Sequence, residues 1–193
     1  MSRKYLLSSE LPDQRLLGLR RPEAEDLGAY LNARNDPELY PFLSITIPMS
    51  RAEEEEWLKR QTAALGNAPS DIVFSIDADS HLVGYIGLHR ISWVHRSATI
   101  AVAIFSAEHR KKGIGTGTYQ LIARFAFQHL NLESIRAGVI DGNEGSRKLH
   151  ERCGFRHVGM FERGWWKNGV WKAEHLYELT REKWLELQAI PSQ

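Results

Sequence analysis

The stretch Arg110–Gly117 reads RKKGIGTG, and its three alternating glycines decide the fold that the sequence predicts. Glycine lets the backbone approach a bulky group closely and adopt positive φ angles. Apolar residues recur at helical spacing from Ile114 to Leu130, so we expect a helix that begins inside the stretch. The first N–H groups of a helix lack partners and lie at the positive end of its dipole. Together with the three cations that open the stretch, they indicate a phosphate-binding loop.

Two known phosphate-binding patterns do not fit this loop. A Walker P-loop needs Gly-x-x-x-x-Gly-Lys followed by Ser or Thr, and that spacing is absent here. A dinucleotide-binding fold needs Gly-x-Gly-x-x-Gly directly after a strand and an acidic residue at the end of the next strand. Here the spacing is Gly-x-Gly-x-Gly, Ser106–Lys112 separates it from the preceding apolar run, and Glu133 precedes its strand. A solvated loop ahead of an ordinary helix stays open as an alternative.

The residues on either side of the loop predict a strand–helix–strand unit. Ala98–Phe105 is a nearly continuous apolar run, as expected of a strand that is buried on both faces. Ser134–Ile140 is a second strand, and Asn143 can cap a short helix that ends at Cys153-Gly154.

Other local patterns complete a mixed α/β chain. Pro22 at a first helical position predicts a helix over about residues 22–34. Ser50-Arg51-Ala52-Glu53 is a capping box, which predicts that a second helix starts at Ser50. Asn168-Gly169 is a strong signal for a hairpin turn. The remaining expected elements are a strand at Leu16–Leu19, a hairpin of Asp71–Asp77 with His81–Ile91, a hairpin of Phe155–Trp166 with Val170–Leu179, and a last helix capped by Thr180.

The composition limits the classes to which the protein can belong. The 193 residues hold 25 Lys and Arg against 24 Asp and Glu, a balance that argues against sequence-independent nucleic-acid binding. No apolar run approaches the ~20 residues of a membrane span, and the N-terminus lacks a signal-peptide core. Cys153 is the only cysteine, so neither a disulfide nor a cysteine zinc site is expected. We therefore expect one cytoplasmic domain over residues 1–193, with residues 1–14 as a loose arm, no metal, no membrane contact and no nucleic-acid partner.

The glycine loop and its surroundings resemble a known family. Arg110-x-x-Gly113-x-Gly115 resembles the acyl-CoA signature of the GNAT N-acetyltransferases, and the flanking sequence resembles their RimJ/RimL-like branch. The resemblance extends from about Leu16 to Trp184, with the motifs in the family's order. It implies the GNAT fold of the α/β (α+β) class: a mixed, mostly antiparallel central sheet, splayed in the middle, with helices on both faces. The supporting segments are Leu82–Gly87, Phe125–Leu132, Asn143–Phe155, Glu174–Leu179 and Glu182–Trp184.

The resemblance implies that acetyl-CoA binds at the loop. Main-chain N–H groups from Arg110 to Thr116 would hold the diphosphate, and main-chain groups of Ile104 and Phe105 would pair with the pantetheine arm. Asn143 matches an asparagine that helps to hold this arm, which is compatible with a plain capping role. The expected cofactor-binding residues are Ile104, Phe105, Arg110, Lys111, Lys112, Gly113, Ile114, Gly115, Thr116 and Asn143.

Two departures from the family pattern concern catalysis. Many relatives have a Tyr where this chain has His150, and that Tyr protonates the departing thiolate, which an imidazole can also do. A packed histidine is the alternative. Many relatives have a Glu at the position of Thr99 as the base for the amine, and Thr cannot replace it because it does not titrate usefully. The candidate replacements are His89, Glu162, Glu174 and His175, and of these we select Glu174 and His175 as the possible amine base.

The resemblance predicts direct acetyl transfer from acetyl-CoA to a primary amine of a small molecule or a protein N-terminus. Only a neutral amine attacks a thioester, and at pH 7 an amine of pKa ~8 is roughly 10% neutral, against about 0.04% for one of pKa ~10.4. A chain without the usual carboxylate therefore favours α-amino groups or amino sugars over polyamines.

Alternative functions stay open at this point. One is an acyl-CoA-binding sensor or assembly module without turnover. A second is nucleophilic catalysis by Cys153 with His150, against which the Cys-Gly-Phe sequence resembles a packing motif of the family. The tryptophans near the late hairpin fit an acceptor pocket, core packing or a homodimer contact. They are Trp93, Trp165, Trp166 and Trp171.

Overall fold

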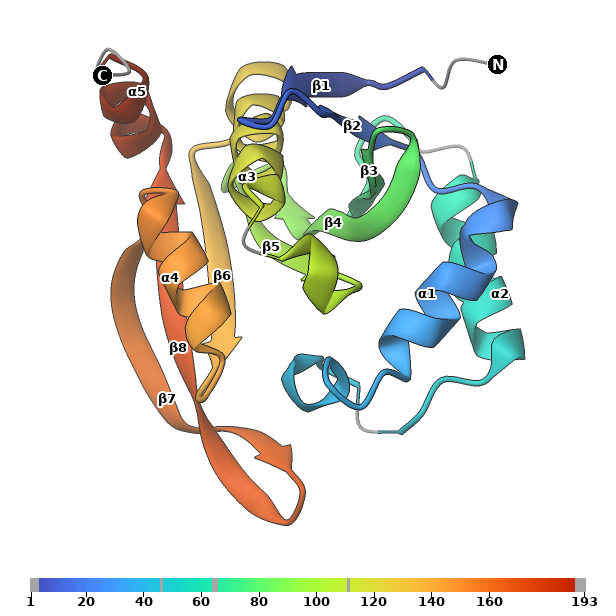
Figure 1. Cartoon of the computed structure of the whole chain (residues 1–193). Helices are drawn as coiled ribbons and strands as arrows, with labels where there is room; N and C mark the ends of the chain where they lie inside the picture. The colour runs from blue at the N-terminus through green and yellow to red at the C-terminus, as the bar shows by residue number, and fades with distance from the viewer. Residues whose placement is uncertain (1–3, 46, 64–65, 111, 190–193) are drawn as a thin grey trace.

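The computed structural model describes residues 4–45, 47–63, 66–110 and 112–189. Within these residues the strands form one eight-stranded sheet in the order β1-β2-β3-β4-β5-β6-β8-β7 (Figure 1). Neighbouring strands are antiparallel except β5 and β6, which are parallel. The mixed, mostly antiparallel sheet is the predicted one, and its parallel pair is the predicted strand–helix–strand unit.

The strand boundaries follow the sequence signals closely. At the turn between the last two strands, Asn168 and Gly169 have φ angles of 51° and 78°, which confirms the predicted Asn-Gly hairpin. The strands are β1 (Leu7–Glu10), β2 (Leu16–Arg20), β3 (Ile72–Ala78), β4 (His81–Ser92), β5 (Ser97–Ile104), β6 (Ser134–Ile140), β7 (Arg156–Lys167) and β8 (Val170–Thr180).

The predicted helices are present, but the first starts later than Pro22 predicts: a 3₁₀ turn begins at Ala24 and α1 at Leu27. Ser50 and Glu53 form the reciprocal capping box at the start of α2, and Asn143 accepts a hydrogen bond from the N–H of Ser146 at the start of α4. No helix formed by the described residues is long and apolar enough to cross a membrane. The helices are α1 (Leu27–Arg34) after a 3₁₀ turn (Ala24–Asp26), α2 (Arg51–Thr62), α3 (Ile114–Arg124), α4 (Glu144–Arg152) and α5 (Arg181–Ala189).

Helices cover both faces of the sheet. Phe74 and Ser75 are neighbours on β3, so their side chains point to opposite faces. Phe74 packs edge-on against Phe125 at the end of α3, with ring centroids 5.4 Å apart. The Ser75 hydroxyl lies 3.0 Å from the Tyr30 hydroxyl of α1. We call these two sides the α3 face and the α1 face, and Figure 1 shows α1 and α2 side by side, apart from α3 and α4.

The sheet splays between its two parallel strands, as predicted. β5 and β6 pair only through Ser97–Thr99 and Ser134–Arg136. Beyond Thr99, β5 stays paired with β4 as far as Ile104, whereas β6 pairs with β8 as far as Ile140. The two strands therefore separate toward their carboxyl ends, next to the glycine loop.

Two other parts of the chain also differ from the sequence prediction. Leu7–Glu10 form β1, which pairs with β2, and Leu7 and Leu11 are buried, so this part of the segment expected as a loose arm is ordered in the sheet. The sequence of this strand, LSSE, has too few apolar residues for a strand to be predicted from it. The long predicted helix is α-helical only to Arg124 and continues as a π-helical segment over Phe125–His129.

A buried ion network joins the sheet to α1. The Arg20 guanidinium of β2 donates to both carboxylate oxygens of Asp26, each at 2.7 Å, and its Nε donates to Asp77 of β3 at 2.9 Å. Asp26 also accepts from the Ser75 hydroxyl, which contacts Tyr30. All of these residues are buried, so each charge depends on its partners for the stabilisation that water would otherwise provide.

We expect Arg20→Met to lower the free energy of unfolding by about 3–5 kcal/mol, because it leaves two buried carboxylates without their counter-charge. Urea unfolding measures the change. Arg15→Met is the matched control, because Arg15 pairs with Asp13 in solvent and its loss should change stability little. An Arg20→Met protein as stable as the wild type would contradict the network's role.

Candidate functional site

The glycine loop begins α3 as predicted. Gly113 has a φ of 80°, a left-handed conformation that other side chains rarely adopt, and α3 starts at Ile114. The Gly117 N–H donates to the Gly113 carbonyl at 2.9 Å. By helix geometry the N–H groups of Ile114, Gly115 and Thr116 precede this bond and point out of the helix end. Three adjacent donors therefore lie at the positive end of α3.

Two of the three predicted cations can be located beside these donors. The Arg110 Nη1 lies 3.8 Å from the Glu38 carboxylate, and its Nη2 is buried without a hydrogen-bond partner among the described residues. Lys112 is exposed, and Lys111 lies outside the described residues. Glu38 belongs to the connection between α1 and α2, so the sequence around it gave no sign of this contact. The spare donor of Arg110 fits an anion at the loop.

The main chain of β5 satisfies only part of the prediction for a pantetheine arm. The Phe105 N–H donates to the Val83 carbonyl of β4 at 2.9 Å, so this donor is already paired. Main-chain groups alternate in direction along a strand, so those of Ile104 point the other way, into the splay beside β6. Ile104 can therefore pair with an extended ligand, whereas the N–H of Phe105 cannot.

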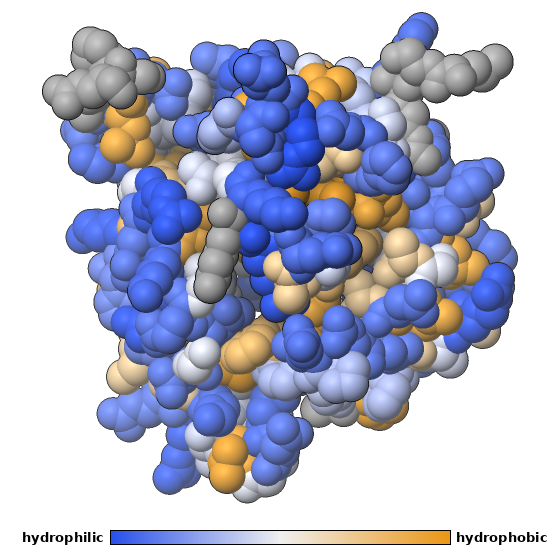
Figure 2. Space-filling model, viewed as in Figure 1, coloured by the Kyte–Doolittle hydropathy of each residue, from blue (hydrophilic) through white to orange (hydrophobic). Residues whose placement is uncertain are grey.

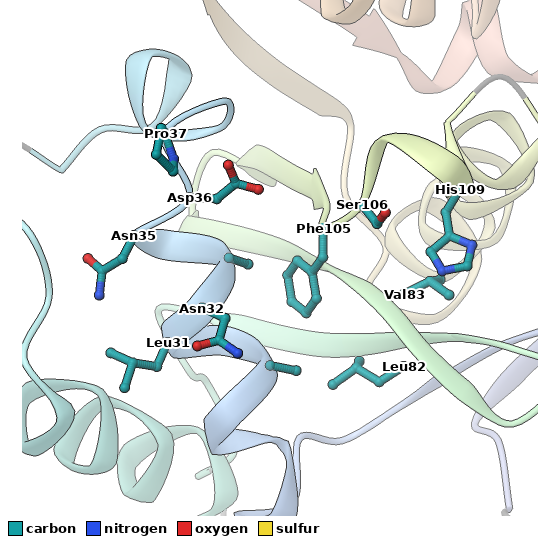
Figure 3. A pocket seen from close by; sticks show the side chains of 12 residues that line it. Leu31, Asn32, Asn35, Asp36, Pro37, Leu82, Val83, Phe105, Ser106 and His109 are labelled. Carbon is teal, nitrogen blue, oxygen red and sulfur yellow. The ribbon is translucent and has the colours of Figure 1, made fainter.

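A cavity of about 670 Å³ lies between α1 and the end of β5. Figure 3 shows the Phe105 ring between α1 and the connection that carries Ser106 and His109. Asn32, Asn35 and Asp36 line the cavity from α1 and the residues after it. Figure 2 shows apolar surface among charged side chains where Figure 1 has the gap between α3 and α1. The cavity thus adjoins the residues that lead into the glycine loop.

The two predicted candidates for the amine base lie on opposite faces of the sheet. Thr99 pairs with Arg136 of β6, which pairs with Glu178 of β8, so these three residues share one face. By alternation Glu174 shares that face, and His175 lies on the other. Thr99 is also opposite His89, which lies on the same face of β4 as Tyr85. Because Tyr85 stacks on Tyr30 of α1, Glu174 and Thr99 are on the α1 face.

Glu174 borders the splay. A Cβ built on Gly138 of β6 would lie 2.1 Å from its Oε1, so the carboxylate covers that glycine at the edge of the opening. His175 lies on the α3 face, where its Nε2 is 3.5 Å from Asp141 and its Nδ1 3.4 Å from His157. Glu162 is exposed on β7. Among Glu162, Glu174 and His175, the candidate bases in the last hairpin, Glu174 is the one that lies at the opening.

His150, predicted to protonate the thiolate, is buried under α4. Its Nδ1 lies 2.7 Å from the Ser146 carbonyl and its Nε2 2.8 Å from the Tyr119 hydroxyl. A carbonyl can only accept, so Nδ1 carries the proton, and in the neutral ring Nε2 accepts from Tyr119. The ring also stacks on Tyr177. Both nitrogens are therefore engaged with the protein, an arrangement that favours a packing role, while the catalytic role stays a prediction.

Burial also shifts the pKa values of His150 and of Cys153. Burial lowers the pKa of His150 to about 4, so the ring is neutral near pH 7. Burial raises the pKa of the Cys153 thiol to about 12, so it stays protonated and is not an activated nucleophile. Asn143 serves as the helix cap described above, which leaves its amide N–H₂ for a ligand.

The four tryptophans do not form one cluster. Trp93 donates to the Pro69 carbonyl and packs against the core. Trp166 and Trp171 form an exposed edge-to-face pair at the end of the last hairpin, with ring centroids 5.4 Å apart. The indole N–H of Trp165 is buried and has no hydrogen-bond partner among the described residues.

Comparison with known proteins gives a consistent set of matches. A family model described as the acetyltransferase (GNAT) domain matches residues 16–156. YdaF of Bacillus subtilis, a candidate ribosomal N-acetyltransferase, is 32% identical over 67% of this chain and 67% of its own length. Spermidine N(1)-acetyltransferase of Vibrio cholerae is 29% identical over 56% of this chain and 62% of its own length.

Solved structures share the fold. The spermidine N-acetyltransferase of Vibrio cholerae in complex with CoA and spermine has a TM-score of 0.79 at 26% identity, and the match covers 88% of this chain and 98% of that one. RimJ of Mycobacterium smegmatis in complex with CoA-disulfide has a TM-score of 0.79 at 21% identity, covering 97% and 90%. The second match concerns the fold alone.

The pKa of His150 predicts how stability depends on pH. The unfolded chain binds the proton below about pH 6.5 and the folded chain only below about 4, so stability is complete above pH 6.5 and falls as the pH drops between these values. At about pH 5 this group alone should cost about 2 kcal/mol. Urea unfolding at several pH values measures the change.

The matched control is the double variant His150→Phe/Tyr119→Phe, which removes both polar partners together. Its stability should fall less between pH 7 and 5 than that of the wild type. Equal pH dependence in the two proteins would show that His150 is not buried in its neutral form.

Proposed function

The chain belongs to the GNAT acetyltransferase family, and we propose that it transfers the acetyl group of acetyl-CoA to a primary amine. Family membership confirms the resemblance that the glycine loop predicted. The observation that carries the proposal is the position of the α3 N-terminus at the splay of β5 and β6. A diphosphate at the three free N–H groups leaves an extended arm next to the main chain of Ile104, inside the opening.

The residues around the opening fit the two parts of this co-substrate. Arg110 and Lys112 supply positive charge beside the donors of α3, and the left-handed Gly113 lets the backbone turn around the anion. Glu174, on the α1 face, supplies a carboxylate that can pair with the ammonium form of the acceptor. His175 lies on the other face of the sheet, where it contacts Asp141 and His157. Positioning of amine and thioester is then the main catalytic contribution.

Thr116→Pro tests the diphosphate site through the main chain. Proline is tolerated in the first turn of a helix, and this change removes one N–H that makes no intrahelical bond. We expect the affinity for CoA to fall at least about 10-fold, the effect of losing one hydrogen bond to a charged group. Titration calorimetry measures it. Thr116→Val, which keeps the N–H and loses only the hydroxyl, is the control and should bind CoA nearly as well as the wild type.

The absence of a carboxylate at Thr99 supports acceptors of low pKa. An amine of pKa ~8 is neutral often enough at pH 7 to react without strong base assistance, whereas one of pKa ~10.4 is rarely neutral. We therefore propose α-amino groups, as in peptides, or amino sugars as the acceptor class. The similarity to the Vibrio cholerae spermidine N-acetyltransferase favours a second candidate, a polyamine.

A panel of amines separates these candidates. With acetyl-CoA present, we expect a peptide α-amine or an amino sugar to be acetylated with a kcat/KM about 10² times that of spermidine, the ratio of the neutral fractions. Release of the CoA thiol measures turnover. A higher kcat/KM for spermidine would favour the polyamine candidate instead. Binding of acetyl-CoA without thiol release from any amine would leave the sensor function.

A further inference from the structure

An Asp–His pair lies on the α1 face at the closed end of the splay. Asp71 directly precedes β3, and its Oδ1 is 2.9 Å from the His89 Nδ1 of β4. Burial acts to raise the pKa of Asp71, but hydrogen bonds from Ser70 and His89 outweigh it and hold this pKa below its ordinary value. An ionised carboxylate can only accept, so Nδ1 of His89 carries the proton. In the neutral ring, Nε2 then presents a free lone pair.

The backbone beneath the ring fixes where this lone pair lies. A Cβ built on Gly87 would lie 2.4 Å from the Nε2 of His89, so the ring extends over the glycine. Gly87 pairs with Ala101 of β5, two residues past Thr99 in the direction in which β5 leaves β6. Nε2 has no hydrogen-bond partner among the described residues, and the His89 side chain is 30% exposed. The ring therefore projects toward the opening from its closed end.

Small residues leave room in front of the ring. Gly87 and Ala101 face each other on this side of β4 and β5, between the His89–Thr99 pair at one end and the Tyr85–Ala103 pair at the other. Glu174 borders the other side of the opening from β8. Arg90, next to His89, donates from its guanidinium to the Thr99 hydroxyl, and Arg136 of β6 lies on the far side of Thr99.

We propose that His89 is the base that accepts the amine proton and that Asp71 is its positioning residue; this rests on the proposed acetyl transfer. Nε2 takes one proton from the ammonium form of the acceptor. The freed nitrogen lone pair attacks the thioester carbonyl, a C–N bond forms and the C–S bond breaks with its electron pair on sulfur. The second amine proton ends on the thiolate, and the proton on His89 passes to water. The products are the acetamide, CoA thiol and one released proton.

The pair is built like other Asp–His pairs in which a carboxylate fixes the tautomer of a catalytic imidazole. The position of His89 also suits a replacement for the carboxylate that Thr99 lacks, because His89 lies directly opposite Thr99 on β4. The ring's close approach to Gly87 depends on the absence of a side chain there. The requirement for Gly87 makes the geometry testable without touching the histidine itself.

His89→Asn is the main test, because its side-chain amide can still donate to Asp71 but offers no group at the position of Nε2. With the best acceptor of the amine panel, we expect kcat to fall about 10²-fold, the usual contribution of a general base, while the Kd of acetyl-CoA stays within about twofold. The matched control is His81→Asn on the same strand. Its Nδ1 contacts a turn carbonyl, and its loss should leave kcat unchanged.

Two further variants separate catalysis from packing. His89→Ala should recover activity when free imidazole is added, which a structural defect would not do. In Gly87→Ala the three atoms nearest to the new Cβ all belong to the His89 ring, which must move, so kcat should fall with the histidine still present. Gly87→Ala/His89→Asn should then be no slower than His89→Asn alone, because both changes remove the same group.

The outcomes distinguish this proposal from the one on which it rests. A wild-type protein that releases no thiol with any amine overturns both. Turnover by the wild type together with an unchanged kcat for His89→Asn overturns the role of His89 alone. Loss of activity in His89→Ala without rescue by imidazole, at unchanged thermal stability, overturns it as well.

Discussion

The separation of β5 from β6 is the constraint on which the rest of the molecule depends. The two strands pair over three residue pairs and then diverge, while each keeps its pairing with its outer neighbour. A parallel pair that opens in this way exposes main-chain groups that a continuous sheet would satisfy internally. The free groups of Ile104 and the free N–H groups of α3 lie at the same end of this opening. An extended ligand with an anionic group satisfies both sets at once.

The sheet divides the chemistry between its two faces. On the α3 face, His150 sits among Tyr119, Phe155 and Tyr177 with both nitrogens engaged, as expected of a polar group that packing has enclosed. On the α1 face, His89 and Glu174 keep polar atoms at the edge of the opening. In the proposed reaction, a ligand held at the α3 N-terminus would extend through the splay to the second group, which the open sheet allows.

The sequence predicted those parts of the fold that local chemistry decides. Ser50 with Glu53, and Asn168 with Gly169, have one favoured backbone arrangement each, and both were predicted correctly. β1 could not be predicted, because its polar sequence gains order only by pairing with β2. The features of the candidate site also divide into those set by local sequence and those set by distant segments. The glycine loop is local and was predicted, whereas the contact of Glu38 with Arg110 and the burial of His150 depend on distant segments.

The pairing of His89 with Asp71 shows why the sequence selected Glu174 and His175, and not His89, from four candidate bases. Four residues had suitable chemistry, and alternation along a strand gives each one a face but not a neighbour. The deciding feature is a carboxylate 18 residues earlier, which carries no motif, together with Gly87 at the end of the Leu82–Gly87 segment on the same face. The structure explains the glycine at position 87, because a side chain there would occupy the space that the His89 Nε2 fills. The proposed base therefore depends on both residues: His89 supplies the imidazole, and Gly87, without a side chain, leaves space for its ring on the same face of β4.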